Sequence, residues 1–397
     1  MLKGKCVVLG VTGSIAAYKI ANLASALVKL GADVNVIMTQ NATNFINPIT
    51  FETLTSNKCL VDTFDRNFQF NVEHVALAKR ADIFMVAPAS ANVIAKMAHG
   101  IADDMLTTTI LAAKCKKLVS PAMNTNMFTN PIVQDNLEIL KKYGFEIIQP
   151  ASGYLACGDT GAGKMPEPDV LLSYILRELA HEHDMVGKKV LVTAGPTEEA
   201  IDPVRYITNH STGKMGYSIA KAAMERGAEV TLVSGPVALE PPMFVDVVNV
   251  RSAAEMAEAV KSRAKSCDII IKSAAVADYR PVTVAQEKIK KKEGEKSSIE
   301  LERTEDILSY LGAHKKPGQF ICGFSMETEN MLENSQAKLK KKNVDMIVAN
   351  NLRTKGAGFG TDTNVVTLIM SDEYYELPLM SKEDVAHAIL DTILENK

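Results

Sequence analysis

The sequence has no tryptophan, little aromatic content and no excess of positive charge. Aromatic residues make up 6% of its 397 residues, which argues against the stacking surfaces that bind single-stranded nucleic acid. The formal net charge of −3 supplies no positive field for nucleic acid or an acidic membrane. No apolar run reaches the roughly 18 residues of a transmembrane helix. We therefore expect neither a nucleic-acid partner nor a membrane partner.

Cysteines are few and scattered, and no two form a C-x-x-C pair. This spacing favours neither a zinc site nor a disulfide framework, so we expect a protein of the reducing cytoplasm. The N-terminal segment is apolar for a few residues, but it runs into a glycine turn without a small-residue cleavage site. We interpret it as a mature strand and not as a signal peptide.

The order of apolar runs and glycine turns predicts two α/β domains. Residues 6–9 form an apolar run, a glycine turn and a helical pattern follow, and a second apolar run occupies residues 34–38. This is a βαβ unit. The same plan restarts at residues 188–193. We predict two doubly wound, Rossmann-like domains, with bounds 1–184 and 185–397 because a polar stretch separates the halves.

The first glycine turn, residues 10–14, lies between a predicted strand and a predicted helix, where backbone N–H groups suit a phosphate. It does not match G-x-G-x-x-G, and Met38 and Thr39 stand where a dinucleotide site needs an acidic residue. A nicotinamide dehydrogenase is therefore excluded. Residues 158–164 match the P-loop pattern, but Met165 replaces its hydroxyl residue and Pro166 follows, so we do not assign a P-loop.

Four segments in the first half carry a specific resemblance: residues 13–18, 87–92, 121–127 and 156–159. In their order and their residues they resemble the homo-oligomeric flavin-containing cysteine decarboxylases, and the resemblance covers nearly all of residues 1–180. The resemblance implies a flavodoxin-like domain that binds FMN. It places the flavin contacts at Gly13, Ser14, Ile15, Thr39, Ser90 and Asn92.

The same resemblance implies three catalytic residues. His74 would be the acid/base that also orients the substrate, because imidazole changes charge near neutral pH. Asn124 would hold the substrate carboxylate, and Cys157 would protonate the enethiolate formed when carbon dioxide leaves. Outside the resemblance, His74 is an ordinary structural histidine and Cys157 an ordinary thiol. The glycine-rich stretch around Cys157 suits a mobile flap.

The second half resembles phosphopantothenate–cysteine ligase throughout residues 187–397. The segments that carry the resemblance are residues 202–216, 274–281, 288–291 and 323–324. The fused type implies CTP as the activating nucleotide, an acyl-cytidylate intermediate and Mg²⁺ on the phosphates. Lys288 would stabilise charge on the phosphates, and Asn209 would act on the acyl intermediate. By composition alone, Lys288 belongs to a solvated loop.

The resemblance also places further nucleotide contacts in this half. Lys338 and Lys342 lie four residues apart and so share one helix face, although composition alone makes them surface lysines. Asp278 would touch nucleotide or metal, but the metal ligands as a set stay unknown. The full set of these contacts is Asp278, Glu305, Asp306, Ile307, Leu308, Phe324, Lys338 and Lys342.

Together the two halves resemble the bifunctional phosphopantothenoylcysteine decarboxylase/phosphopantothenate–cysteine ligase family of coenzyme A biosynthesis. The implied substrates are 4′-phosphopantothenate, cysteine and CTP, and the implied product is 4′-phosphopantetheine. The implied assembly is a homo-oligomer with a trimer-based flavin half and a dimeric ligase half, which a dodecamer would satisfy. Two alternatives stay open: a regulatory flavin-binding protein of this fold, and another cysteine decarboxylase fused to an unrelated α/β domain.

Overall fold

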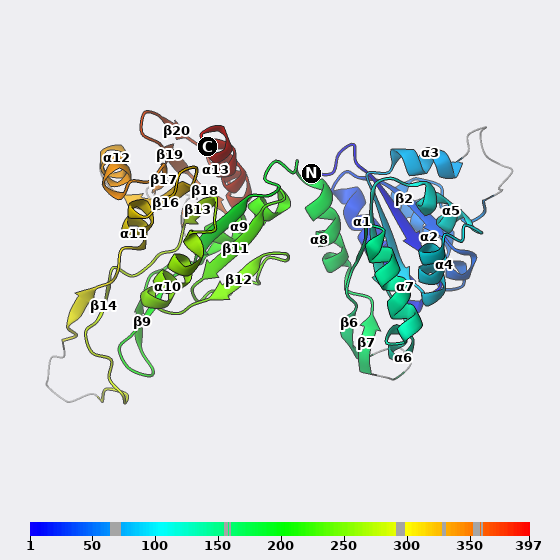
Figure 1. The fold of residues 1–397 in the computed structure, drawn as a ribbon, viewed down its shortest axis with the longest axis horizontal. Coiled ribbons are helices and arrows are strands. Elements are labelled where there is room, and N and C mark those ends of the chain that lie inside the picture. Colours follow the sequence, from blue (N-terminus) through cyan, green and yellow to red (C-terminus); the bar gives the residue numbers. More distant parts are fainter. Residues whose placement is uncertain are drawn as a thin grey trace. The chain divides into compact units, whose positions relative to one another are not determined.

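The computed structural model describes residues 1–63, 73–154, 158, 160–290, 298–327, 331–351, 358 and 360–397. These form two compact units, Met1–Glu182 and His183–Lys397. Within the described residues, no helix is long and apolar enough to cross a membrane. The elements of both units carry their labels in Figure 1.

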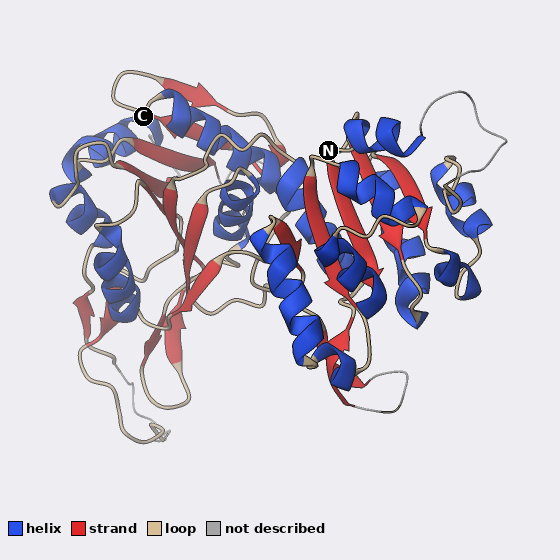
Figure 2. Ribbon diagram, turned by 45° about the vertical axis from the view of Figure 1, so that its right-hand side comes forward, coloured by secondary structure: helices blue, strands red, loops and turns tan. Residues whose placement is uncertain are grey.

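The N-terminal unit is built on a five-stranded parallel sheet of order β2-β1-β3-β4-β5. Its inner strands are continuous apolar runs because helices cover both faces (Figure 2). The strands are β1 (Cys6–Val11), β2 (Asp33–Met38), β3 (Ile83–Ala89), β4 (Lys116–Pro121) and β5 (Phe145–Ile147).

Two hydrophobic clusters, one on each face, hold these helices to the sheet. One face carries α1 (Tyr18–Lys29), α2 (Pro48–Thr55) and α8 (Pro168–Leu179). The opposite face carries α3 (Glu73–Arg80), α4 (Ala91–His99), α5 (Met105–Ala112) and α7 (Pro131–Lys142). The remaining elements are η1 (Ile15–Ala17), η2 (Gln40–Asn44), α6 (Thr125–Phe128) and the hairpin of β6 (Ala151–Tyr154) and β7 (Thr160–Lys164).

The C-terminal unit contains an eight-stranded sheet of order β12-β11-β8-β13-β16-β17-β19-β20. The first six strands of this order are parallel, and the last two are antiparallel additions at one edge. The strands are β8 (Lys189–Ala194), β11 (Glu229–Ser234), β12 (Asp246–Asn249), β13 (Ile269–Lys272), β16 (Phe320–Glu327), β17 (Met346–Asn351), β19 (Val366–Ile369) and β20 (Tyr374–Glu376).

Helices again cover both faces of this sheet. One face packs against α9 (Lys214–Glu225) and α13 (Lys382–Glu395), the other against α10 (Ala253–Ala264), α11 (Ile307–Ala313) and α12 (Met331–Lys342). Three small two-stranded sheets complete the unit: β9 (Glu198–Ala200) with β10 (Tyr206–Thr208), β14 (Tyr279–Pro281) with β15 (Leu301–Arg303), and β18 (Thr363–Asn364) with β21 (Met380–Ser381).

Both units therefore have the doubly wound α/β fold that the sequence predicts. In each, the chain lays strands to one side of a first strand and then returns to build the other side. The point of reversal is the β1–β3 pair in the N-terminal unit and the β8–β13 pair in the C-terminal unit. Ligands bind open α/β sheets beyond the carboxyl ends of the strands at such points.

Candidate active sites

In the N-terminal unit, Thr12 ties together the carboxyl ends of β1 and β3. Its buried hydroxyl donates to the carbonyl of Pro88 at 2.7 Å and accepts from the N–H of Ser90 at 2.9 Å. These two hydrogen bonds fix the glycine turn after β1 against the start of α4 at the carboxyl edge of the sheet.

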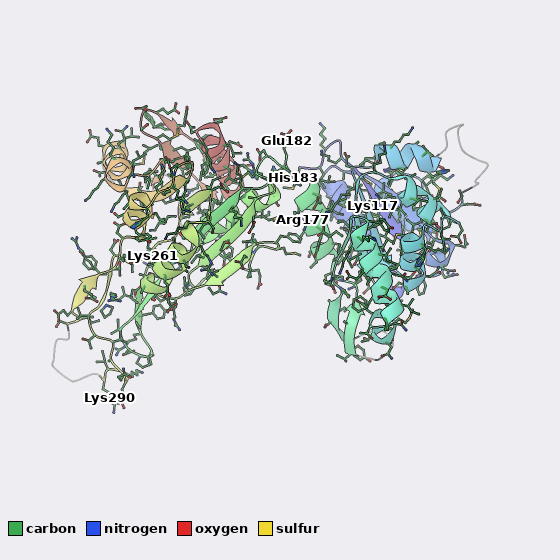
Figure 3. The ribbon with its side chains drawn as sticks, viewed as in Figure 1. Lys117, Arg177, Glu182, His183, Lys261 and Lys290 are labelled. Atoms are coloured by element: carbon green, nitrogen blue, oxygen red, sulfur yellow. The ribbon has the colours of Figure 1, made fainter. Side chains whose placement is uncertain are left out.

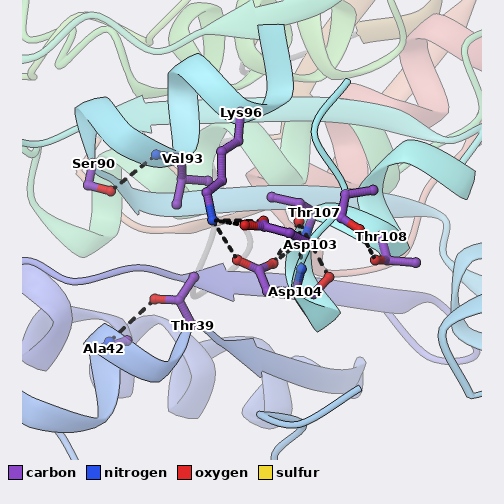
Figure 4. Close-up of polar contacts among 10 residues, drawn as sticks. Thr39, Ala42, Ser90, Val93, Lys96, Asp103, Asp104, Thr107 and Thr108 are labelled. Atoms are coloured by element: carbon purple, nitrogen blue, oxygen red, sulfur yellow. Dashed lines mark hydrogen bonds and ion pairs between the residues drawn. The ribbon is translucent and has the colours of Figure 1, made fainter. Parts of the chain in front are cut away.

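Two predicted flavin contacts, Ser14 and Ser90, begin neighbouring helical segments. The Ser14 hydroxyl accepts from the N–H of Ala16 at 3.3 Å. The Ser90 hydroxyl accepts from the N–H of Val93 at 3.4 Å, as Figure 4 shows. Such caps satisfy only part of the N–H groups at a helix start, so both termini remain suited to an anion.

Thr39 and Gly13 both involve η2, which follows β2: Thr39 begins it and Gly13 lies against it. The Thr39 hydroxyl accepts from the N–H of Ala42 at 3.3 Å and begins η2 (Figure 4). A Cβ on Gly13 would come within 2.9 Å of the Cβ of Asn41. Only glycine allows the turn after β1 to approach η2 this closely.

A cavity of about 590 Å³ opens beside these segments, within the roughly 300–1,000 Å³ usual for cofactor sites. Of the predicted residues, Gly13, Ser14, Ile15, Ser90 and Asn124 line it. Thr39 and Asn92 do not. The walls also carry apolar side chains that are unusually exposed for their size: Ile15, Tyr18, Met127 and Tyr154. A flat aromatic ring system would cover this apolar surface.

An ion pair in the cavity wall was not predicted from the sequence. The Nζ of Lys19 lies 2.7 Å from an Oε1 of Glu167, with Lys164 at 3.7 Å from the same carboxylate. The hydrogen bond from Lys19 lowers the pKa of Glu167. The available signal was that Lys19 lies four residues before Leu23 and so on the same buried face of α1.

The three predicted decarboxylase residues are not all assembled at this cavity. Asn124 lines it and begins α6, where its Oδ1 accepts from the N–H of Asn126 at 2.8 Å. His74 is half-buried at the start of α3 and does not line it. Figure 1 shows α3 at the opposite edge of the N-terminal sheet from α6, β6 and β7. Cys157 lies outside the described residues.

In the C-terminal unit, the predicted nucleotide contacts gather around one cavity of about 430 Å³. Its lining includes all of them: Asp278, Glu305, Asp306, Ile307, Leu308, Phe324, Lys338 and Lys342. The sequence separation between the first and last of these residues is large, so the fold itself brings them together.

Asp306, at the start of α11, holds one of the lysines of this cavity in place. Asp306 caps the helix by accepting from the N–H of Ser309 at 2.9 Å, and its carboxylate pairs with Lys342. Although burial opposes the shift, the bonds from Lys342 and Ser309 lower the pKa of Asp306. Lys338, one turn before Lys342, donates to the carbonyl of Phe324 at 3.3 Å.

A second cavity, of about 490 Å³, adjoins the first and contains Asn209. The Nδ2 of Asn209 donates to the carbonyl of Ala275 at 2.9 Å, and the N–H of Ala275 donates to the carbonyl of Gly195, also at 2.9 Å. Lys272 and Lys338 line both cavities. Lys272 was not predicted from the sequence, where it directly follows the apolar run of residues 269–271.

Lys288 is exposed and lines none of these cavities. Its loop is anchored one residue later: the N–H of Ile289 donates to the buried carboxylate of Asp202 at 3.1 Å, and its carbonyl accepts from Arg205 at 2.9 Å. The bonds from Arg205 hold the pKa of Asp202 far below its usual range. In Figure 3, Lys290 marks the outer end of this loop.

Both halves of the chain match known families. Residues 1–180 match the family described as Flavoprotein, and residues 185–396 match the DNA/pantothenate metabolism flavoprotein C-terminal domain. The "Coenzyme A biosynthesis bifunctional protein CoaBC" of Bacillus subtilis is 48% identical over 99% of this chain and 97% of its own length. The chain belongs to this family of bifunctional proteins.

The chain is also similar to a decarboxylase with a different name and to a solved structure of a C-terminal domain. A "Cysteine/Cysteine sulfinic acid decarboxylase" from an unknown prokaryotic organism is 46% identical over 88% of this chain and 99% of its own length. The crystal structure of the C-terminal domain of a coenzyme A biosynthesis bifunctional protein covers 54% of this chain and 98% of its own, at 48% identity and a TM-score of 0.46.

Family membership confirms the general prediction from the sequence. The chain is a bifunctional enzyme of coenzyme A biosynthesis, with a decarboxylase half that is a flavoprotein and a ligase half. The individual site residues, the nucleotide and the metal remain predictions from the resemblance.

Proposed function

We propose that the C-terminal unit joins cysteine to 4′-phosphopantothenate through an acyl-cytidylate made from CTP, and that the N-terminal unit decarboxylates the product with FMN. The observation that carries this proposal is a single cavity lined by all eight residues of the predicted contact set from Asp278 to Lys342, directly beside the cavity that contains Asn209. Activation and amide formation need these two compartments to adjoin, because they share one intermediate.

The N-terminal cavity fits FMN in its charge and its surface. The starts of η1 and α4 offer N–H groups to one phosphate, and the exposed Ile15 and Tyr18 offer an apolar wall to the ring. Bound FMN supplies the oxidation and reduction that make decarboxylation possible. Asn124 holds the departing carboxylate with a neutral amide, and Cys157 returns a proton to the carbon chain.

The distance of α3 from this cavity supports an oligomeric decarboxylase. His74 and Asn124 are assigned to one substrate, yet only Asn124 lines the cavity of its own chain. We propose that His74 completes the site of a neighbouring copy in a trimer-based assembly. The proposed dimer of the ligase half would then combine trimers into a larger homo-oligomer such as a dodecamer.

The ligase cavity fits a triphosphate with Mg²⁺. Lys338 and Lys342 face it with positive charge, and Asp278 offers a carboxylate to a metal that is also held by phosphate oxygens. Lys288 lies on a loop whose base is anchored by Asp202 and Arg205. We propose that this loop brings Lys288 to the phosphates when nucleotide is bound.

One alternative is favoured by a specific observation, the similarity to a cysteine/cysteine sulfinic acid decarboxylase. A protein of that kind would release carbon dioxide from free cysteine or cysteine sulfinate. It would have no need of a nucleotide cavity with all eight predicted contacts in place, which is why we prefer the two-step proposal.

The test is mass spectrometry of the purified, full-length protein with 4′-phosphopantothenate, cysteine, CTP and Mg²⁺, after its flavin absorbance is recorded. We expect 4′-phosphopantetheine with one pyrophosphate per product, and no carbon dioxide from free cysteine. Carbon dioxide from cysteine or its sulfinate without CTP would support the alternative. Product with ATP but not CTP would refute the nucleotide assignment alone.

A further inference from the structure

Lys272 occupies the point in the C-terminal sheet where the strand order reverses. It is the last residue of β13, in register with Thr193 of β8 on one side and Gly323 of β16 on the other. A side chain at this place stands at the carboxyl edge of the sheet, where a doubly wound fold binds its ligand.

Lys272 also belongs to both cavities of the unit. It lines the one that contains the predicted nucleotide contacts and the one that contains Asn209. In the proposed ligase reaction, the nucleotide occupies the first and the acyl group occupies the second. The α-phosphoryl group is common to the occupants of both cavities. It is first part of the nucleoside triphosphate and then the link to the acyl carbon.

The ammonium group of Lys272 has little to neutralise it. Within the part of the chain that the structure describes, its hydrogen-bond partner is the carbonyl of Ala274 at 3.2 Å, and no carboxylate lies within ion-pair distance. Burial and the nearby cations Lys338 and Lys342 lower its pKa to about 8, against the opposing effect of Asp306 and Asp278. The group is therefore still mainly charged at neutral pH.

A half-buried cation that has no carboxylate partner among the described residues and lies near Lys338 and Lys342 is costly in the free enzyme. An anion that enters the cavity removes this cost, and its own charge is stabilised in return. The site is thus preorganised for negative charge at the place where the two cavities meet, which is the arrangement that lowers the barrier of phosphoryl and acyl transfer.

We propose that Lys272 is a further catalytic residue of the ligase half, contacting a non-bridging oxygen of the α-phosphoryl group in both half-reactions. This inference rests on the proposed nucleotide-dependent ligation. In the first step a carboxylate oxygen attacks the α-phosphorus and the bond to the β-phosphate breaks, releasing pyrophosphate. In the second, the cysteine amine attacks the acyl carbon and loses a proton to solvent, the bond from carbon to phosphate oxygen breaks, and the nucleoside monophosphate leaves. Lys272 keeps its proton throughout.

The test compares Lys272→Met and Lys272→Arg in the full-length protein. Pyrophosphate release is measured with CTP and 4′-phosphopantothenate in the absence of cysteine, and CTP affinity is measured separately. Lys272→Met should slow release about 100-fold, the usual effect of removing one preorganised donor, with a smaller change in affinity. Lys272→Arg should recover most of the rate. Lys221→Met, which removes a lysine paired with Glu383 outside these cavities, is the matched control.

A pH profile gives a second readout that does not need the methionine variant to fold. In the wild type, kcat/KM for CTP should fall as pH rises through about 8, because Lys272 loses its proton. Lys272→Arg stays charged and should lose this decline. An unchanged rate in Lys272→Met, a loss confined to CTP affinity, or an unchanged decline in Lys272→Arg would overturn the proposal. Absence of pyrophosphate from the wild type would instead refute the nucleotide-dependent ligation.

Discussion

The two units share one architecture but prepare their cavities differently. In the N-terminal unit the cavity is made of capped helix starts and exposed apolar side chains, and its buried lysine is neutralised by Glu167. In the C-terminal unit two lysines line both cavities, and Lys272 has no carboxylate partner among the described residues. The first suits a cofactor with one phosphate and a large ring, and the second suits a polyphosphate whose charge changes during reaction.

The largest effect is expected for Gly163→Ala, which should lower the flavin content of the N-terminal unit and leave the reaction of the C-terminal unit unchanged. Gly163 has φ of +127°, and a Cβ there would lie 2.3 Å from the carbonyl oxygen of Met123. Gly163→Ala should therefore displace β7 from the cavity edge and reduce bound flavin to below about a tenth, since strain and a clash act together. Pyrophosphate release should stay normal. Gly100→Ala, which has a positive φ but open space, is the control for strain alone. Normal flavin content in Gly163→Ala would contradict the cavity assignment.

The next effect tests the charged cavity. Lys342→Met should weaken CTP binding about 10-fold to 100-fold, because charge-assisted hydrogen bonds contribute about 1.5–3 kcal/mol. Flavin absorbance should not change. Calorimetric titration with CTP and Mg²⁺ measures the affinity. Lys341→Met removes an exposed lysine adjacent on α12 and should bind CTP as the wild type does. Equal affinities for the two variants would remove Lys342 from the nucleotide site.

A smaller effect concerns the base of the Lys288 loop and depends on pH. The pKa of Asp202 is lower in the folded protein than in the unfolded chain, so its stabilising effect is present above about pH 4 and is lost as pH falls below that value. Asp202→Asn should therefore melt below the wild type at pH 7, and the gap should narrow toward pH 3. Melting curves across this range check the prediction. A gap independent of pH would contradict the ion pair with Arg205.

The smallest effect is expected at the ion pair of the flavin cavity. The Lys19 side chain is 11% exposed, but that of Glu167 is 60% exposed, so solvent screens the pair. Glu167→Gln should change the free energy of unfolding by less than about 1 kcal/mol. Urea unfolding of the flavin-free protein measures this. A loss of several kcal/mol would show that this ion pair stabilises the N-terminal unit despite its exposure to solvent.

Much of the fold follows from local pattern. Apolar runs such as residues 34–38 and glycine turns at strand ends sufficed for two doubly wound sheets, because each βαβ unit is specified by neighbouring residues. The antiparallel edge formed by β19 and β20 was not predicted. Its short strands carry no periodicity that separates them from loops.

The site residues, in contrast, could not be assigned from local sequence pattern. Asp278 and Lys342 could be assigned to one cavity only through a family resemblance, because no spacing in sequence relates them. Lys19 and Lys272 were missed since a single lysine in a helix or at a strand end is ordinarily solvated. Lys19 is distinguished by its burial and Lys272 by its place in the lining of both cavities, and each depends on the packing of distant segments.

The central claim is that two separate sites act in sequence on an intermediate that leaves the first. The most direct test mixes Gly163→Ala, which should keep ligation, with Lys342→Met, which should keep decarboxylation. With 4′-phosphopantothenate, cysteine, CTP and Mg²⁺, at a CTP concentration that leaves Lys342→Met without measurable ligation, the mixture should form 4′-phosphopantetheine much faster than either variant alone. Failure of the mixture, while each variant keeps its own half-reaction, would contradict the account.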